Sequence, residues 1–178
     1  MEKNRETKDM KIKEFVREFI GSKEPAQIEF KNVEESIGFE LHRNLKEFWN
    51  SFCFNQIDGI LHPSQIKLTE KWGNWFDYEG QNEEILITLL GIKVDDDISK
   101  IVHTRLSSWT GGIDFGKRIE LGTIEDTRGD MILVFNNDTG EIEWIDFEYG
   151  QFGDLNKDPN GVLADSIEEL LELLTRNK

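Results

Sequence analysis

Three β-type runs separated by two turn signals constrain the fold of this chain more than any other feature. The runs cover residues 117–124, 131–136 and 141–148. Between the last two lies the tetrapeptide Asn137-Asp138-Thr139-Gly140. Because Asn, Asp and Gly tolerate the positive φ of tight turns, this tetrapeptide between two apolar runs predicts a β-hairpin. The segment therefore predicts an antiparallel sheet.

Amphipathic helices are predicted on both sides of this region. Apolar residues recur at i, i+3, i+4 and i+7 in two stripes, one from Ile12 to Ile20 and one from Leu45 to Phe52. Near the C-terminus, Ser166 and Glu169 form an S-x-x-E capping box ahead of a leucine-rich run. This order predicts an α+β fold, with a mainly antiparallel central sheet flanked by N-terminal helices and a C-terminal helix.

The domain is expected to span residues 10–178 and to follow a flexible charged arm over residues 1–9, which are nearly all polar. Other segments have weaker signals, and residues 83–92 combine the β-branched residues of a strand with the length of a helix. The predicted elements are a helix at 33–37, a strand within 54–62, a helix at 83–92 and a strand at 101–106.

The charge balance excludes several classes of partner. The chain has 21 Lys and Arg against 36 Asp and Glu, a formal net charge of −15. Residues 125–172 contain 14 acidic residues and only two basic ones, Arg128 and Lys157. Nucleic acids and anionic membrane surfaces are disfavoured, because both are held by clustered Lys and Arg. An acidic surface can serve solubility alone, or it can attract a basic protein.

The environment is predicted to be the cytoplasm. The single cysteine, Cys53, excludes an internal disulfide framework and suits a reducing compartment. No apolar run approaches the roughly 18 residues of a membrane-spanning helix, so no membrane insertion is expected.

Motifs that carry chemistry are largely missing. Neither glycine-loop pattern for phosphate occurs, and the histidines lack the spacing of zinc ligands. Residues 154–165 resemble a calcium loop, but an acidic surface loop fits better, because Pro159 stands at the sixth position, where glycine is required. We therefore expect no catalytic, cofactor or metal residues. A metal-dependent hydrolase using Asp146, Glu148 and Asp154 is a minor alternative.

Partner contact is the favoured role for the exposed charges and aromatic residues. Trp72 and Trp75 lie in a dense aromatic segment, which is predicted to be either a loop pinned to the sheet or a contact patch. Alternation along a strand places Glu141 and Glu143 on the face opposite that of Asp146 and Glu148. The candidate partner-binding residues are Asp126, Asp130, Glu141, Glu143, Trp144, Asp146, Glu148, Asp154, Asp158, Trp72 and Trp75.

Three segments, in the right order, resemble the SUKH superfamily. Residues 32–41 running into 44–48 are similar to its opening pair of helices. Residues 129–134 and 138–148 are similar to its central hairpin, and residues 164–170 to its closing helix. The family includes bacterial immunity proteins, a fungal cell-wall-assembly regulator and the SecY-interacting protein Syd.

The resemblance implies an α+β fold and a non-enzymatic binding role. With the acidic charge, it favours an immunity protein that neutralises a basic, nuclease-type toxin. The alternative is a Syd-like protein that binds the basic cytoplasmic loops of the SecY translocon, because the middle segment around residues 65–69 looks more like that branch.

Overall fold

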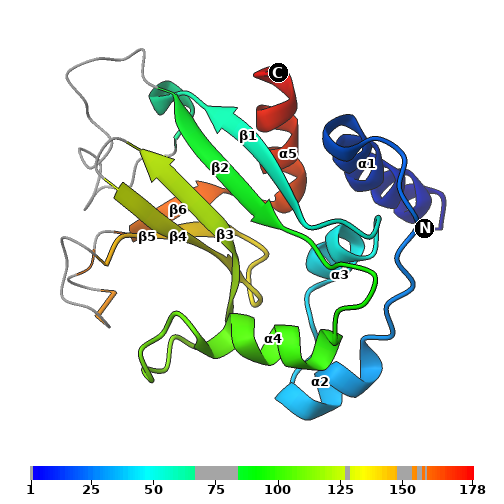
Figure 1. Cartoon of the computed structure of the whole chain (residues 1–178), viewed down its shortest axis with the longest axis horizontal. Coiled ribbons are helices and arrows are strands. Elements are labelled where there is room, and N and C mark those ends of the chain that lie inside the picture. Colours follow the sequence, from blue (N-terminus) through cyan, green and yellow to red (C-terminus); the bar gives the residue numbers. More distant parts are fainter. Residues whose placement is uncertain (1, 67–83, 127–128, 148–153, 156–157, 159) are drawn as a thin grey trace.

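A computed structural model describes residues 2–66, 84–126, 129–147, 154–155, 158 and 160–178. Its described residues form a six-stranded sheet in which each strand pairs antiparallel with the next along the chain. Figure 1 shows β1, β2 and β3 side by side, with β4, β5 and β6 beyond β3. Their bounds are β1 Gln56–Leu61, β2 Ile85–Leu90, β3 Arg118–Asp126, β4 Gly129–Asn136, β5 Ile142–Ile145 and β6 Asn160–Ala164.

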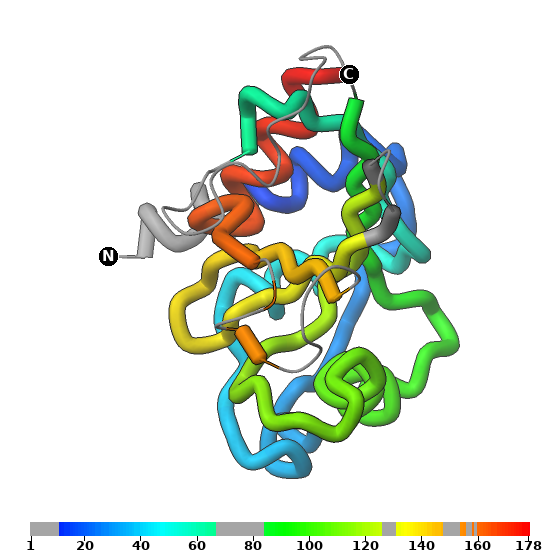
Figure 2. The backbone as a smooth tube through the Cα atoms, turned by 90° about the vertical axis from the view of Figure 1, so that its left-hand side faces the viewer, coloured from blue at the N-terminus to red at the C-terminus, as the bar shows by residue number. Residues whose placement is uncertain are grey.

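The helices surround this sheet unequally. Helices α1, α3 and α5 contact one another, and α1 and α5 also contact β1. Figure 2 shows α1 (blue) and α5 (red) lying together, with α2 and α4 at the other end of the molecule. The helical bounds are α1 Glu2–Ile20, α2 Lys31–Ile37, α3 Arg43–Trp49, α4 Ile98–Ser107 and α5 Ile167–Arg176, with a short 3-10 turn η1 Pro63–Gln65.

The main core lies between the sheet and helices α1, α3 and α5. Its largest buried side chains include Trp49 and Phe48 of α3 and Trp144 and Phe135 of the sheet. Period-two alternation explains this arrangement, since Ile85, Ile87 and Leu89 are buried along β2 while the residues between them are more exposed. The predicted α+β architecture is confirmed.

The hairpin of β4 and β5 forms at the predicted turn. Gly140 has φ of +82° and donates its N–H to the Asn136 carbonyl at 2.8 Å. The Asn137 side chain accepts from the His42 N–H at 2.7 Å and donates to the Glu40 carbonyl at 2.9 Å. The turn therefore also fastens the sheet to the connection between α2 and α3.

The C-terminal helix begins as its sequence predicts. The Ser166 hydroxyl accepts from the Glu169 N–H at 3.1 Å, and the Glu169 carboxylate accepts from the Asp165 N–H at 2.6 Å. Helix α1 instead begins at Glu2, so residues 2–9 are helical where a flexible arm was expected.

Two predicted elements have the wrong type. Residues 85–90 are strand β2 and not helix, because they pair with both β1 and β3 and bury alternate side chains. Residues 98–107 are helix α4 where a strand was expected over 101–106. The Asp97 carboxylate caps this helix by accepting from the Lys100 N–H at 3.1 Å. In both segments tertiary partners outweigh the local composition.

Strand β6 was not predicted, because residues 154–165 were expected to be an acidic surface loop. Residues 160–164 pair with β5 and bury Leu163 and Ala164. Because the acidic segment ends in a strand of the sheet, Leu163 and Ala164 belong to the core.

Candidate partner-binding surface

Within the described residues, one face of the sheet is left partly open over β1–β3. A small cluster, Trp109, Phe115, Val134 and Ile145, covers the β4–β5 end of this face. The β1–β3 end stays more exposed, and Leu86 at its centre has 47% of its surface accessible. Cross-strand pairing assigns eight residues to this surface, here called the open face: Gln56, Asp58, Ile60, Leu86, Thr88, Leu90, Thr123 and Glu125.

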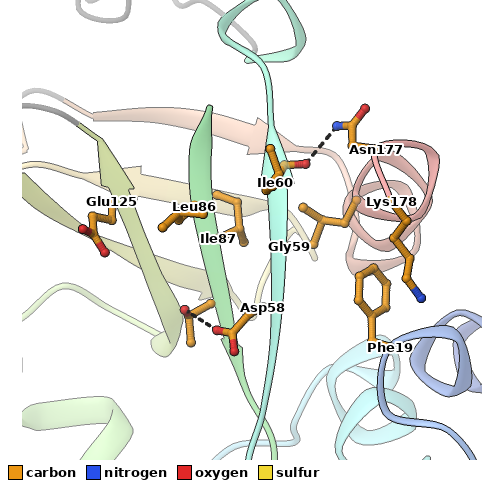
Figure 3. A pocket seen from close by; sticks show the side chains of 11 residues that line it. Phe19, Asp58, Gly59, Ile60, Leu86, Ile87, Glu125, Asn177 and Lys178 are labelled. Atoms are coloured by element: carbon orange, nitrogen blue, oxygen red, sulfur yellow. Dashed lines mark hydrogen bonds between the residues drawn. The ribbon is translucent and has the colours of Figure 1, made fainter. Parts of the chain in front are cut away.

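A groove of about 530 Å³ runs from the open face over the outer edge of β1, and is here called the edge groove. Figure 3 shows Asp58 and Ile60 of β1 on one side of it, with Phe19 and Lys178 on the other. The groove is lined by residues 58–60, residues 86–88, Glu125, Phe19, Leu174, Asn177 and Lys178.

Two carboxylates, Asp58 and Glu125, lie beside the groove. Asp58 Oδ1 accepts from the Thr88 hydroxyl at 2.8 Å, and both Asp58 oxygens lie 2.9 Å from Gln56 Nε2. Both donors are neutral, so the carboxylate is oriented without being neutralised. Glu125 is exposed, and no ion pair joins it to another described residue.

Lys178 is the one basic residue lining the described part of the groove, and its ammonium group is directed towards helix α1. Lys178 Nζ donates to the Glu18 carbonyl and lies 4.7 Å from the centre of the Phe19 ring. The open face therefore presents an exposed leucine between two carboxylates that form no ion pair with another described residue. Apolar contact combined with negative charge suits a basic protein surface.

A second cavity of about 550 Å³ lies between β2, β3 and α4. Arg105 Nη2 donates to the Gly91 carbonyl at 2.7 Å, and its guanidinium carbon lies 5.2 Å from the Trp49 ring centre. Burial lowers the pKa of Arg105, partly offset by Glu120. Burial raises the pKa of Glu120, and Arg105 and the Ser108 hydroxyl offset only part of that rise.

The raised pKa of Glu120 predicts a pH-dependent stability. Folding disfavours the ionised form of Glu120. The free energy of unfolding therefore falls as the pH rises from the pKa of Glu120 in the unfolded chain through its higher pKa in the folded protein. Glu120→Gln removes this charge and should raise the thermal midpoint slightly at pH 7. The gain should vanish at about pH 3.5, below the unfolded pKa, where the carboxyl is protonated in both states. The exposed Glu35→Gln is the control. A lower midpoint for Glu120→Gln at pH 7 would mean that attraction to Arg105 outweighs burial.

Several predicted contact residues are buried and cannot form a surface. Trp144, Asp146 and Asp158 are 1%, 3% and 0% exposed. The prediction that Trp144 anchors a partner is therefore corrected, because alternation along β5 turns it towards the main core. Asp146 and Asp158 likewise do not contribute exposed charge.

Other predicted residues are half-buried or engaged within the chain. Glu143 is neutralised by Arg118, whose Nε lies 2.5 Å from its carboxylate, and also accepts from Asn136 at 2.8 Å. Glu141 accepts from the Thr139 hydroxyl at 2.9 Å and is half-buried. Asp154 is half-buried, and its N–H donates to Asp158 at 3.0 Å. These acids do not converge into one patch.

Asp126 is the last residue of β3, and Asp130 lies near the start of β4. Asp130 pairs with Glu125 in the ladder between β3 and β4, and Asp126 pairs with Gly129. The structure thus brings these two predicted positions beside the exposed Glu125. Trp72, Trp75 and Glu148 lie outside the described residues.

The segment resembling a calcium loop is closed by its own hydrogen bonds. Asp158 accepts from the Asp154 N–H, and Asn160 Nδ2 donates to the Leu155 and Asp158 carbonyls at 2.6 and 2.7 Å. In the part of the chain that the structure describes, no three His, Cys, Asp or Glu residues are grouped to hold a metal ion.

Sequence reasoning missed Asp58, Leu86 and the open position of Glu125. The available signal was the β-branched pair Ile85 and Ile87 followed by Thr88, which favours a strand. Had residues 85–90 been predicted as a strand, alternation would have placed Leu86 and Thr88 on the face opposite the core.

Fold and surface together define an α+β protein with an exposed acidic sheet face. Searches with protein-family models, against curated proteins and against solved structures find no match to this chain. Within the described residues, no helix combines the length and the apolarity needed to span a membrane.

Proposed function

We propose that this chain is a non-enzymatic, cytoplasmic binding protein that holds a basic protein partner against its open face. The observation that carries the proposal is the exposed Leu86 between Asp58 and Glu125. An apolar centre removes water from an interface, while surrounding charges speed association and reject partners of the wrong sign.

The partner class is a basic, nuclease-type toxin, which makes the chain an immunity protein. Nuclease surfaces carry Lys and Arg because they must hold phosphates. An acidic face that covers them neutralises the enzyme and competes with its substrate. The resemblance of residues 32–48, 129–148 and 164–170 to the SUKH superfamily supports the same role.

Reversing charge on the open face tests this proposal. The double variant Asp58→Lys, Glu125→Lys should slow association with the toxin about tenfold at low salt, because it replaces attraction with repulsion. Leu86→Ser should instead speed dissociation. Association and dissociation rates are measured by surface plasmon resonance, and protection by growth of cells that co-express the toxin. The gene adjoining that of this chain is the first candidate for the toxin.

Matched variants elsewhere provide the controls. Glu35→Lys changes an exposed charge on α2, and Val94→Ser changes an apolar residue with 63% exposure outside the open face. Both should leave rates and protection unchanged. Equal rates for the open-face variants and these controls would contradict the proposed surface. Absence of rescue by the wild-type chain, together with binding to basic SecY loop peptides, would favour the Syd-like alternative.

A further inference from the structure

No other strand of the described residues pairs with the outer edge of β1. The Gly91 N–H donates to the Asn55 carbonyl at 2.8 Å. Asn55 and every second residue after it therefore direct their backbone N–H and C=O groups towards β2. Asp58 and Ile60 therefore direct their N–H and C=O groups outwards. The Ile60 carbonyl accepts from Asn177 Nδ2 at 2.9 Å (Figure 3), and this contact confirms the direction. No described residue bonds to the outward backbone groups of Asp58.

The space beside this edge is the edge groove. Gly59 has no side chain on the helix side, where a Cβ would lie 3.0 Å from the end of Leu174. Phe19 and Lys178 form the opposite wall (Figure 3). An added strand would lie between this wall and β1. Its side chains would point alternately towards Asp58 on the open face and towards Phe19 and Leu174 on the helix side.

The charge beside the edge selects the occupant. Natural proteins commonly blunt an exposed edge with charged side chains, lysine above all, and the charge near the middle of β1 is the negative one of Asp58. A second copy of this chain, paired antiparallel about the middle of β1, would bring two Asp58 carboxylates together, and like charges in cross-strand positions destabilise pairing. A segment with basic residues facing Asp58 gains attraction instead.

From this geometry we infer that the edge groove receives an extended basic segment of the partner, which adds to the sheet as a strand beside β1. This inference rests on the proposed function, since it describes how the basic partner is held. Main-chain hydrogen bonds to Asp58 supply affinity, and alternate side chains supply selectivity: basic towards Asp58, apolar towards Phe19 and Leu174.

A capped octapeptide of alternating lysine and valine is the probe. It can place every lysine on the open face and every valine on the helix side. Two isomers carry N-methyl groups, one on all the lysines and the other on all the valines. Because alternate N–H groups point to opposite edges of a strand, each isomer blocks one edge only. Antiparallel addition needs the lysine N–H groups, and parallel addition needs those of the valines.

We expect one methylated isomer to bind at least about tenfold more weakly than the parent peptide, while the other binds like the parent, because the blocked edge can no longer form its hydrogen bonds to Asp58. The amide proton of Asp58 should become protected from hydrogen exchange when the parent binds. Asp58→Asn should weaken binding about threefold through loss of charge, whereas Glu35→Gln should not.

Any other pattern overturns the inference. Equal binding by all three peptides would show that the basic segment lies on the face without pairing, and weakening by both isomers would show an effect unrelated to one edge. Absence of peptide binding would also overturn it. None of these results affects rescue from the toxin, so strand addition can fail while the proposed function stands. If the chain failed to rescue cells from the toxin but still paired with the peptide, the proposed function would fail while strand addition stood.

Discussion

Replacing Gly122 by alanine is expected to lower the free energy of unfolding by about 3 kcal/mol or more. Gly122 lies at the bulge between β3 and β4 and pairs with Leu89 of β2. A Cβ at this position would lie 1.8 Å from the Thr88 carbonyl oxygen and 3.2 Å from the Leu89 Cα. Both atoms are backbone, so relief requires β2 and β3 to separate. The measurement is urea unfolding followed by circular dichroism.

The neighbouring Thr123→Ala variant is the control for Gly122→Ala. Thr123 is half-exposed on the open face, so its truncation leaves the spacing between β2 and β3 unchanged. We expect a loss below about 1 kcal/mol from it. A Gly122→Ala protein as stable as the control would show that the two strands are not held this closely.

Replacing Trp144 by alanine should have an effect of similar size. Trp144 is 1% exposed in the main core, and removing a buried Trp typically costs about 3–5 kcal/mol. In a protein of this size, that corresponds to a fall in the thermal midpoint of roughly 10 °C. Differential scanning calorimetry measures it directly.

The same experiment separates a core role from an anchoring role. An exposed anchor would lower affinity on substitution and leave stability nearly unchanged. Trp144→Phe keeps much of the apolar volume, so we expect it to be less destabilised and to bind the partner as the wild type does. A stable Trp144→Ala protein with weakened binding would restore the anchoring role and contradict the buried position.

Local signals were sufficient for part of the fold. The turn at Asn137–Gly140, the cap at Ser166 and the stripe from Ile12 to Ile20 each depend on contacts within a few residues, and each formed at the predicted place. The segments at 85–90 and 98–107 did not follow their predictions. A short apolar run satisfies helix and strand equally, and partners distant in sequence decided between them.

Less of the candidate site than of the fold could be predicted from the sequence. The sequence indicated that the chain is acidic and favoured its last third as the binding region. In the structure, Trp144, Asp146 and Asp158 are buried, and Glu143 forms an ion pair with Arg118. In their place the sheet exposes Asp58 and Leu86, from strands that lie earlier in the chain.

By itself, the sequence determined the α+β class, the hairpin, the closing helix and the excess of negative charge, because these follow from composition and from interactions between close neighbours. Only the tertiary structure decided which acids are exposed and where they gather. A strand has two faces, and no local signal states which will meet the helices. Packing of α1, α3 and α5 on one face left Asp58, Leu86 and Glu125 on the other, beside an edge with which no other described strand pairs.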